Sequence, residues 1–140
     1  MKGRYTMNKT DKIKKPFVII SAEKNDNSHV ANEERTLNLR QDIEKLGYCF
    51  KNVTGFYKGA KEQSIYTELP SDDIGELFRL AEKLEQESIL FVDCFRNAKL
   101  IYTDGTTKDI GTFKQVSRDE AQQHDSFTFD HLCNGYYICE

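Results

Sequence analysis

The sequence predicts an α/β (α+β) fold: a ferredoxin-like β-α-β-β-α-β sandwich with additional C-terminal antiparallel strands and a short third helix. Apolar and amphipathic segments follow one another in that order between Phe17 and Asp93. Two dipeptides that favour two-residue hairpins, Asp104-Gly105 and Asn134-Gly135, mark the added strands. The chain has 140 residues, 38% of them hydrophobic, which is enough for one core without disulfides or a metal. We therefore expect a single α/β domain over residues 16–140.

The first strand and the first helix have clear patterns. Residues 17–22 form a nearly continuous apolar run, which is typical of a central strand that is covered on much of both faces. A helix is predicted from about 31 to 46, with a stripe of Thr36, Leu39, Ile43 and Leu46 on one side. Gly47 would end this helix in the left-handed cap that glycine favours.

The next segments complete the β-α-β-β-α-β order. Residues 48–58 and 63–69 are predicted to be strands, and 70–73 open a second helix that buries Ile74, Leu77, Ala81 and Leu84. Residues 88–93 are almost wholly apolar, so this strand needs an interior place in the sheet. Residues 97–103 are expected to return beside it, so that the sheet continues past the fourth strand.

The C-terminal third is predicted to be rich in strands. One strand is expected near 107–116, and the Ser117-x-x-Glu120 capping box that follows it favours a short helix. The last two strands, 127–133 and 136–140, would be joined by a two-residue turn at Asn134-Gly135.

Charge divides the chain into a basic start and an acidic body. Residues 1–15 carry a net charge of +5, whereas the whole chain carries −3, so residues 16–140 carry −8. We expect the basic leader to be disordered. The acidic body argues against duplex nucleic acid as a partner, because neutralisation of phosphates dominates such binding. No apolar segment is long enough for a membrane and no signal peptide is visible, so we expect a cytoplasmic location without membrane association.

The first candidate ligand site follows the first strand, where the helix start carries Asn32, Glu33, Arg35 and Thr36. In α/β sheets, ligands gather beyond the carboxyl ends of strands and at helix N-termini. Arg35 would bind an anion, and a glutamate would act as a base or accept a hydroxyl. An ordinary helix start, with glutamates matched to the helix dipole and a solvated arginine, explains the same residues and is the commoner case.

The second candidate site is the connection between the second and third strands. It offers an aromatic ring, a cation, a carboxylate and a hydroxyl within a short stretch: Tyr57, Lys58, Glu62 and Ser64. The order of its residues is not that of a phosphate-binding Walker loop. An ordinary charged hairpin is again the simpler alternative.

The cysteines and histidines predict neither a metal site nor a cofactor. The four cysteines form no C-x-x-C pair, and the three histidines stand at no spacing that is typical of zinc ligands. Four free thiols are typical of a reducing compartment.

The stretch from Phe17 to Gly105 resembles a family of short uncharacterised bacterial and phage proteins, known as a domain of unknown function. The resemblance is carried by the Asn32-Glu33-x-Arg35 motif of the first helix, its Leu46-Gly47 end, and the Glu62-Gln-Ser64 segment. It implies a grouping and a phage or mobile-element setting, and it implies no activity.

These observations favour a small non-enzymatic accessory protein that binds a host or phage protein, or a small polar ligand. Exposed sheet edges would allow a homodimer. The alternative is an enzyme that acts on a nucleotide or another phosphorylated metabolite with Glu33, Arg35, Lys58 and Glu62, whose side chains would then converge on one pocket. A structural protein packaged in a virion is the third possibility.

Overall fold

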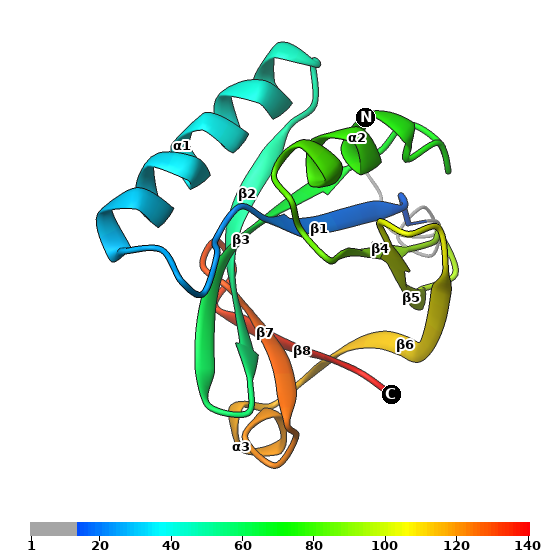
Figure 1. The fold of residues 1–140 in the computed structure, drawn as a ribbon. Coiled ribbons are helices and arrows are strands. Elements are labelled where there is room, and N and C mark those ends of the chain that lie inside the picture. The colour runs from blue at the N-terminus through cyan, green and yellow to red at the C-terminus, as the bar shows by residue number, and fades with distance from the viewer. Residues whose placement is uncertain (1–13) are drawn as a thin grey trace, which may run out of the picture.

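The computed structural model describes residues 14–140, and within them eight antiparallel strands close into a barrel beside three helices (Figure 1). Around the barrel, the strands follow the order β1-β3-β2-β7-β8-β6-β5-β4, and β4 then pairs with β1. The disorder predicted for the basic leader falls almost entirely on residues 1–13, which lie outside the described residues. The elements are β1 (Phe17–Ser21), α1 (His29–Lys45), β2 (Phe50–Tyr57), β3 (Ala60–Glu68), α2 (Gly75–Lys83), β4 (Ser88–Val92), β5 (Asn97–Tyr102), β6 (Thr107–Val116), α3 (Arg118–Ala121), β7 (Ser126–Asp130) and β8 (Gly135–Cys139).

The predicted α/β class is confirmed, but the sheet is a closed barrel and not an open ferredoxin-like sandwich. As expected, β5 continues the sheet beyond β4, from Ser88 opposite Tyr102 to Val92 opposite Ala98. On the other side, β7 pairs with β2, and pairing of β6 with β8 joins the two arms. Closure leaves no long unpaired edge, because every strand then has a neighbour on both sides.

The main apolar core lies outside the barrel, between its wall and two helices. Both α1 and α2 lie against the β1–β3 side of the wall in Figure 1. Alternate wall residues such as Val18, Ile20 and Ile65 are buried there against Leu39 of α1 and Leu77 of α2. The other residues of the same strands point into the lumen, because successive strand side chains face opposite ways.

Helix α1 begins earlier than the sequence pattern indicated. Ser28 is its N-cap, and the Ser28 hydroxyl accepts a hydrogen bond from the backbone N–H of Ala31 at 3.1 Å. Glu33 therefore lies beyond the first turn, where it gains little from the helix dipole. The predicted left-handed cap is confirmed, since Gly47 has a φ of +88°.

The turn between β7 and β8 differs from the predicted two-residue hairpin. Asp130 pairs with Gly135 and Phe129 pairs with Tyr136, so the turn contains the residues 131–134. The Asp130 carboxylate organises this turn, because its Oδ1 accepts hydrogen bonds from the backbone N–H groups of Leu132 at 2.8 Å and Cys133 at 3.3 Å. Asp side chains often stabilise turns by accepting hydrogen bonds from the backbone N–H groups of the next residues. The longer turn at 131–134 is stabilised in this way, without the two-residue Asn-Gly geometry.

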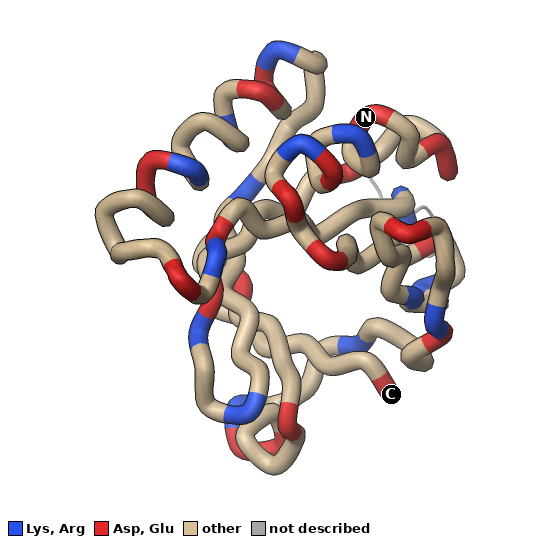
Figure 2. The backbone as a smooth tube through the Cα atoms, viewed as in Figure 1, with Lys and Arg blue, Asp and Glu red and all other residues tan. Residues whose placement is uncertain are grey.

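Charged residues are distributed along most of the described chain. Lys and Arg residues alternate with Asp and Glu residues along α1 and α2, whereas β1 carries no charge (Figure 2). None of the helices in residues 14–140 has the length and apolar content needed to cross a membrane.

Candidate active site

The inner wall of the barrel carries a lane of polar side chains. A cavity in the lumen is lined by one side chain from each of β1, β3, β2 and β7, namely Phe17, Tyr66, Lys51 and Asp130. These side chains therefore point into the barrel. Strand residues two apart share a face, so the lumen side of β1 and β3 also carries Ser21, Ser64 and Glu62. The register agrees, since Ser21 lies opposite Ser64 on the neighbouring strand.

At one end of this lane, hydrogen bonds fasten the end of β1 to β3. The Ser21 hydroxyl donates to the Gln63 carbonyl at 3.1 Å and accepts from the Glu23 N–H at 3.1 Å. The Glu23 carboxylate in turn accepts from the Gln63 N–H at 3.0 Å. Ser21 and Ser64 are buried although both are polar. We call Ser21, Glu23, Glu62 and Ser64 the Glu62 group.

Glu62 combines solvent access with a perturbed carboxyl group. The residue is exposed, yet desolvation by the surrounding barrel raises the pKa of its carboxyl group. The hydroxyl of Ser21 lowers the pKa and the negative charge of Glu23 raises it, and the net shift is upward. A perturbed carboxylate that a ligand can still reach is a feature of functional sites.

Gly55 leaves room beside Glu62. It lies opposite Glu62 on β3 and opposite Thr128 on β7, so it occupies the same inner face. A Cβ atom built on Gly55 would meet only the Glu62 carbonyl oxygen, at 3.8 Å, within a 4 Å radius. Tyr57, two residues further along β2, is 61% exposed, and the Lys58 Nζ lies 5.4 Å from the centre of its ring.

Neither Glu23 nor Glu62 is neutralised by a basic side chain. Within residues 14–140, no Lys, Arg or His side-chain nitrogen lies within 4 Å of a carboxylate oxygen of Glu23 or Glu62. Two neighbouring carboxylates repel each other, which is the reason that Glu23 raises the pKa of Glu62. A cationic ligand would relieve this repulsion, so the Glu62 group is suited to binding a cation.

The predicted site residues on α1 hold the chain after β1 in place. The Arg35 guanidinium donates to the carbonyls of Ala22 and Leu84, both at 2.5 Å, and thereby ties this loop to the end of α2. The Asn32 side chain accepts from the N–H of Lys24 at 2.9 Å and donates to its carbonyl at 3.1 Å.

The other two predicted residues of α1 also have partners within the chain. Thr36 is buried and donates to the Asn32 carbonyl at 2.9 Å, while Glu33 is exposed and lies 3.6 Å from the His29 ring nitrogen. The structure therefore brings Glu62 and Ser64 together on one strand face, and it does not bring Glu33, Arg35 and Lys58 to the lumen cavity that it describes.

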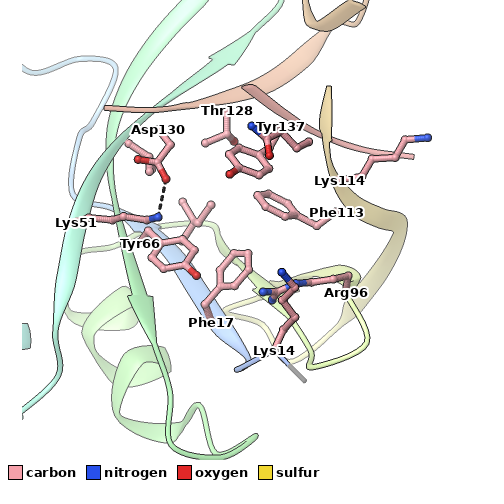
Figure 3. Close-up of a pocket in the computed structure, with 13 residues that line it drawn as sticks. Lys14, Phe17, Lys51, Tyr66, Arg96, Phe113, Lys114, Thr128, Asp130 and Tyr137 are labelled. Carbon is pink, nitrogen blue, oxygen red and sulfur yellow. Dashed lines mark ion pairs between the residues drawn. The ribbon is translucent and has the colours of Figure 1, made fainter. Parts of the chain in front are cut away.

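At the other end of the lane lies a cavity of about 260 Å³ (Figure 3). The Lys51 Nζ lies 2.5 Å from the Asp130 Oδ2 and 4.3 Å from the centre of the Tyr66 ring. Burial opposes ionisation of Asp130, but the Lys51 ammonium and the backbone N–H groups of the following turn outweigh it and lower the pKa. We call this space the lumen cavity.

Sequence reasoning missed the residues of the lumen cavity. Lys51, Tyr66 and Asp130 come from three strands that are distant in sequence, and only closure of the barrel brings them together. On β7 the available signal was strict alternation, because Phe127 and Phe129 separate Ser126, Thr128 and Asp130. On β2 there is no such signal, because Val53 lines the cavity beside Lys51.

Comparison with protein-family models matches residues 18–140 to the S-adenosylmethionine lyase family. No curated protein sequence matches the chain.

Proposed function

Since that match covers nearly all of the described residues, the chain belongs to the S-adenosylmethionine lyase family, and on this premise we propose that it cleaves S-adenosylmethionine without using water. The family match overturns the expectation of a non-enzymatic accessory protein and of a family without known function. It also does not fit the alternative enzyme, which would act on a nucleotide or a phosphorylated metabolite. A phage or mobile-element setting has no support.

The sulfonium of S-adenosylmethionine makes the cleavage possible without an added reagent. When the bond from sulfur to the γ-carbon of the methionine part breaks, sulfur keeps the electron pair and leaves as the neutral thioether methylthioadenosine. A cleavage without water can take its nucleophile from within the substrate, and the substrate's own carboxylate can attack the γ-carbon. One C–O bond then forms as one C–S bond breaks, which gives homoserine lactone. No proton has to move in this step.

The protein's part in this reaction is to bind the substrate and hold it folded. An intramolecular attack gains most from a fixed geometry, because the reacting atoms are already in one molecule. The charges of the attacking carboxylate and of the sulfonium are both reduced in the transition state, so a partly desolvated site favours the reaction. The inner wall beside Gly55 offers such a place, with open space next to a partly desolvated carboxylate.

We place the substrate next to the Glu62 group because its two carboxylates, those of Glu23 and Glu62, have no basic partner within the described residues. S-adenosylmethionine has two cationic groups, the sulfonium and the ammonium, and Glu62 and Glu23 offer charges of the opposite sign. The lumen cavity is less suitable for the sulfonium, because Lys14 and Arg96 line it and would repel a cation. We therefore place the substrate at the Glu62 end, with the exposed ring of Tyr57 as a neighbouring surface for the sulfonium.

The test is to incubate the purified full chain with S-adenosylmethionine and to follow the products by liquid chromatography with mass spectrometry. Methylthioadenosine and homoserine lactone should appear together in equal amounts. Glu62→Gln should slow their formation, and Glu44→Gln, the same change on the exposed side of α1, should not. Formation of S-adenosylhomocysteine instead, or no turnover at all, would contradict the proposal.

Two further expectations remain proposals. Binding of a small charged ligand, rather than duplex nucleic acid, agrees with the acidic body of the chain. A reducing, cytoplasmic setting is supported by the four cysteines, none of which is paired in a disulfide within the described residues.

A further inference from the structure

The lumen cavity has no part in the proposed cleavage. Its volume is about 260 Å³, and no member of the Glu62 group lines it. The two sites nevertheless share one inner wall, because Thr128 lines the cavity and also lies opposite Gly55.

Four aromatic rings form a continuous wall of the cavity. The Phe17 ring centre lies 4.3 Å from that of Tyr66 and 5.0 Å from that of Phe113. The Phe113 ring is stacked on Tyr137 at 5.0 Å, with only 10° between the ring planes. Figure 3 shows these four side chains around the same hollow. A wall of this kind favours a flat aromatic ligand, because offset and edge-on ring pairs add to the gain from burial.

The charges of the cavity leave a surplus of cations. Lys51 is paired with Asp130, and Lys114 is paired with Glu140 at 2.7 Å. Arg96 lines the cavity with its guanidinium carbon 5.2 Å from the centre of the Phe17 ring. In the part of the chain that the structure describes, Arg96 and Lys14 have no carboxylate within 4 Å. The cavity is thus suited to an anion.

The backbone holds Arg96 in an unusual conformation. Arg96 has a φ of +70°, in the left-handed region that glycine and asparagine occupy more easily. Its carbonyl accepts from the Phe113 N–H at 2.8 Å, and its N–H donates to the Asp93 carbonyl at 2.9 Å. Such strained positions are concentrated at functional sites. Glycine would adopt this φ with less backbone strain, but arginine at this position places a guanidinium over the Phe17 ring of the aromatic wall.

The two phenols of the wall stay protonated and can donate hydrogen bonds. Burial raises the pKa of Tyr137 to about 12, and it also raises the pKa of Tyr66. The Tyr66 hydroxyl already donates to the Glu68 carboxylate at 3.3 Å, whereas the Tyr137 hydroxyl lies 3.7 Å from the Cys133 Sγ. Among the cavity residues, the Arg96 guanidinium and the Tyr137 hydroxyl are thus donors that match the acceptor-only oxygens of a carboxylate.

We propose that the lumen cavity is a second binding site, which takes a small planar aromatic carboxylate. The ring of the ligand lies against Phe17 and Phe113, and Arg96 binds its carboxylate. The volume is slightly below the roughly 300–1,000 Å³ of sites for drug-sized ligands, which indicates a ligand of one or two rings. S-adenosylmethionine is a poor occupant because it is larger and carries a sulfonium.

The test uses indole-3-carboxylate as the probe and isothermal titration calorimetry on the full chain. Indole-3-carboxamide has the same shape without the charge, and it should bind at least tenfold more weakly. Arg96→Gln should weaken binding of the carboxylate at least tenfold, and Arg96→Lys, which keeps the charge but loses the fork, should weaken it less. Arg79→Gln, on the exposed side of α2, should leave the affinity unchanged.

Several results would overturn the proposal. They are no binding of the probe at millimolar concentration, equal affinities for the carboxylate and the amide, and equal affinities of the Arg96→Gln and Arg79→Gln variants. Displacement of the probe by S-adenosylmethionine would show that the cavity belongs to the substrate site. The proposal is independent of the proposed lyase activity, because Glu62→Gln should still bind the probe even where turnover is lost.

Discussion

Replacing Lys51 by methionine should destabilise the protein strongly, because it leaves the buried Asp130 carboxylate without its cation. The Asp130 side chain is only 4% exposed, and Lys51 Nζ is its one charged partner among the described ion pairs. Removing one partner of a buried pair costs about 3–5 kcal/mol. Lys51 is 28% exposed and Asp130 keeps two backbone N–H donors, so we expect the lower end, about 3 kcal/mol.

The assay is thermal and urea unfolding of the wild type and of two matched variants. A loss of this size should lower the Tm by about 10 °C in a chain of this length. Lys114→Met removes the cation of the exposed pair with Glu140, whose side chains are 46% and 54% exposed, and it should leave the Tm nearly unchanged. Equal losses of Tm in the Lys51→Met and Lys114→Met variants would refute the reasoning from burial.

Three further predictions concern the acid sensitivity of the fold and the proposed substrate site. Asp130→Asn should remove part of the acid sensitivity of folding, which urea unfolding between pH 2 and pH 7 would show. The pKa of Asp130 is lowered in the folded state. Its carboxylate therefore stabilises the fold above the unfolded pKa of about 3.9, and this stabilisation is lost as the pH falls through the folded pKa. Glu62→Gln should reduce kcat/KM by about tenfold to a hundredfold, the value of a charged contact. In the wild type, kcat/KM should decline on acidification from a pH above the ordinary glutamate pKa, and this limb should be absent from the variant. Gly55→Val should raise KM, because the valine side chain fills the space beside Glu62. The Tm should stay within a few degrees of the wild type, because a Cβ at this position meets no atom closer than 3.8 Å. A large loss of Tm would show that the space is not open.

Local patterns were enough to predict most elements of the fold. The apolar run of β1, the Gly47 cap and the Ser117 cap of α3 depend on residues that are neighbours in sequence, and the structure confirms them. Barrel closure depends on the pairing of β7 with β2, from Val53 opposite Asp130 to Tyr57 opposite Ser126. A short strand's pattern is compatible with several partners, so the sequence left this long-range pairing undetermined.

The candidate site shows the same division between local and distant information. Glu62 and Ser64 were predicted because polar residues gather near one hairpin, and both lie on the inner face of the barrel. Arg35 was predicted either to bind an anion or to be solvated. The solvated alternative is wrong, because the guanidinium donates to the carbonyls of Ala22 and Leu84, which are distant in sequence. The strand predicted over 127–133 ends at Asp130, whose carboxylate both caps the following turn and pairs with Lys51.

The most direct test of the central claim is cleavage of S-adenosylmethionine in water labelled with heavy oxygen. If the substrate's own carboxylate attacks, the homoserine lactone contains no heavy oxygen, and homoserine that forms later by lactone opening carries the label in its carboxyl group. If water attacks the γ-carbon directly, homoserine carries the label in its side-chain hydroxyl. Tandem mass spectrometry distinguishes the two positions. We predict an unlabelled side-chain oxygen, and a labelled hydroxyl would contradict the lyase account.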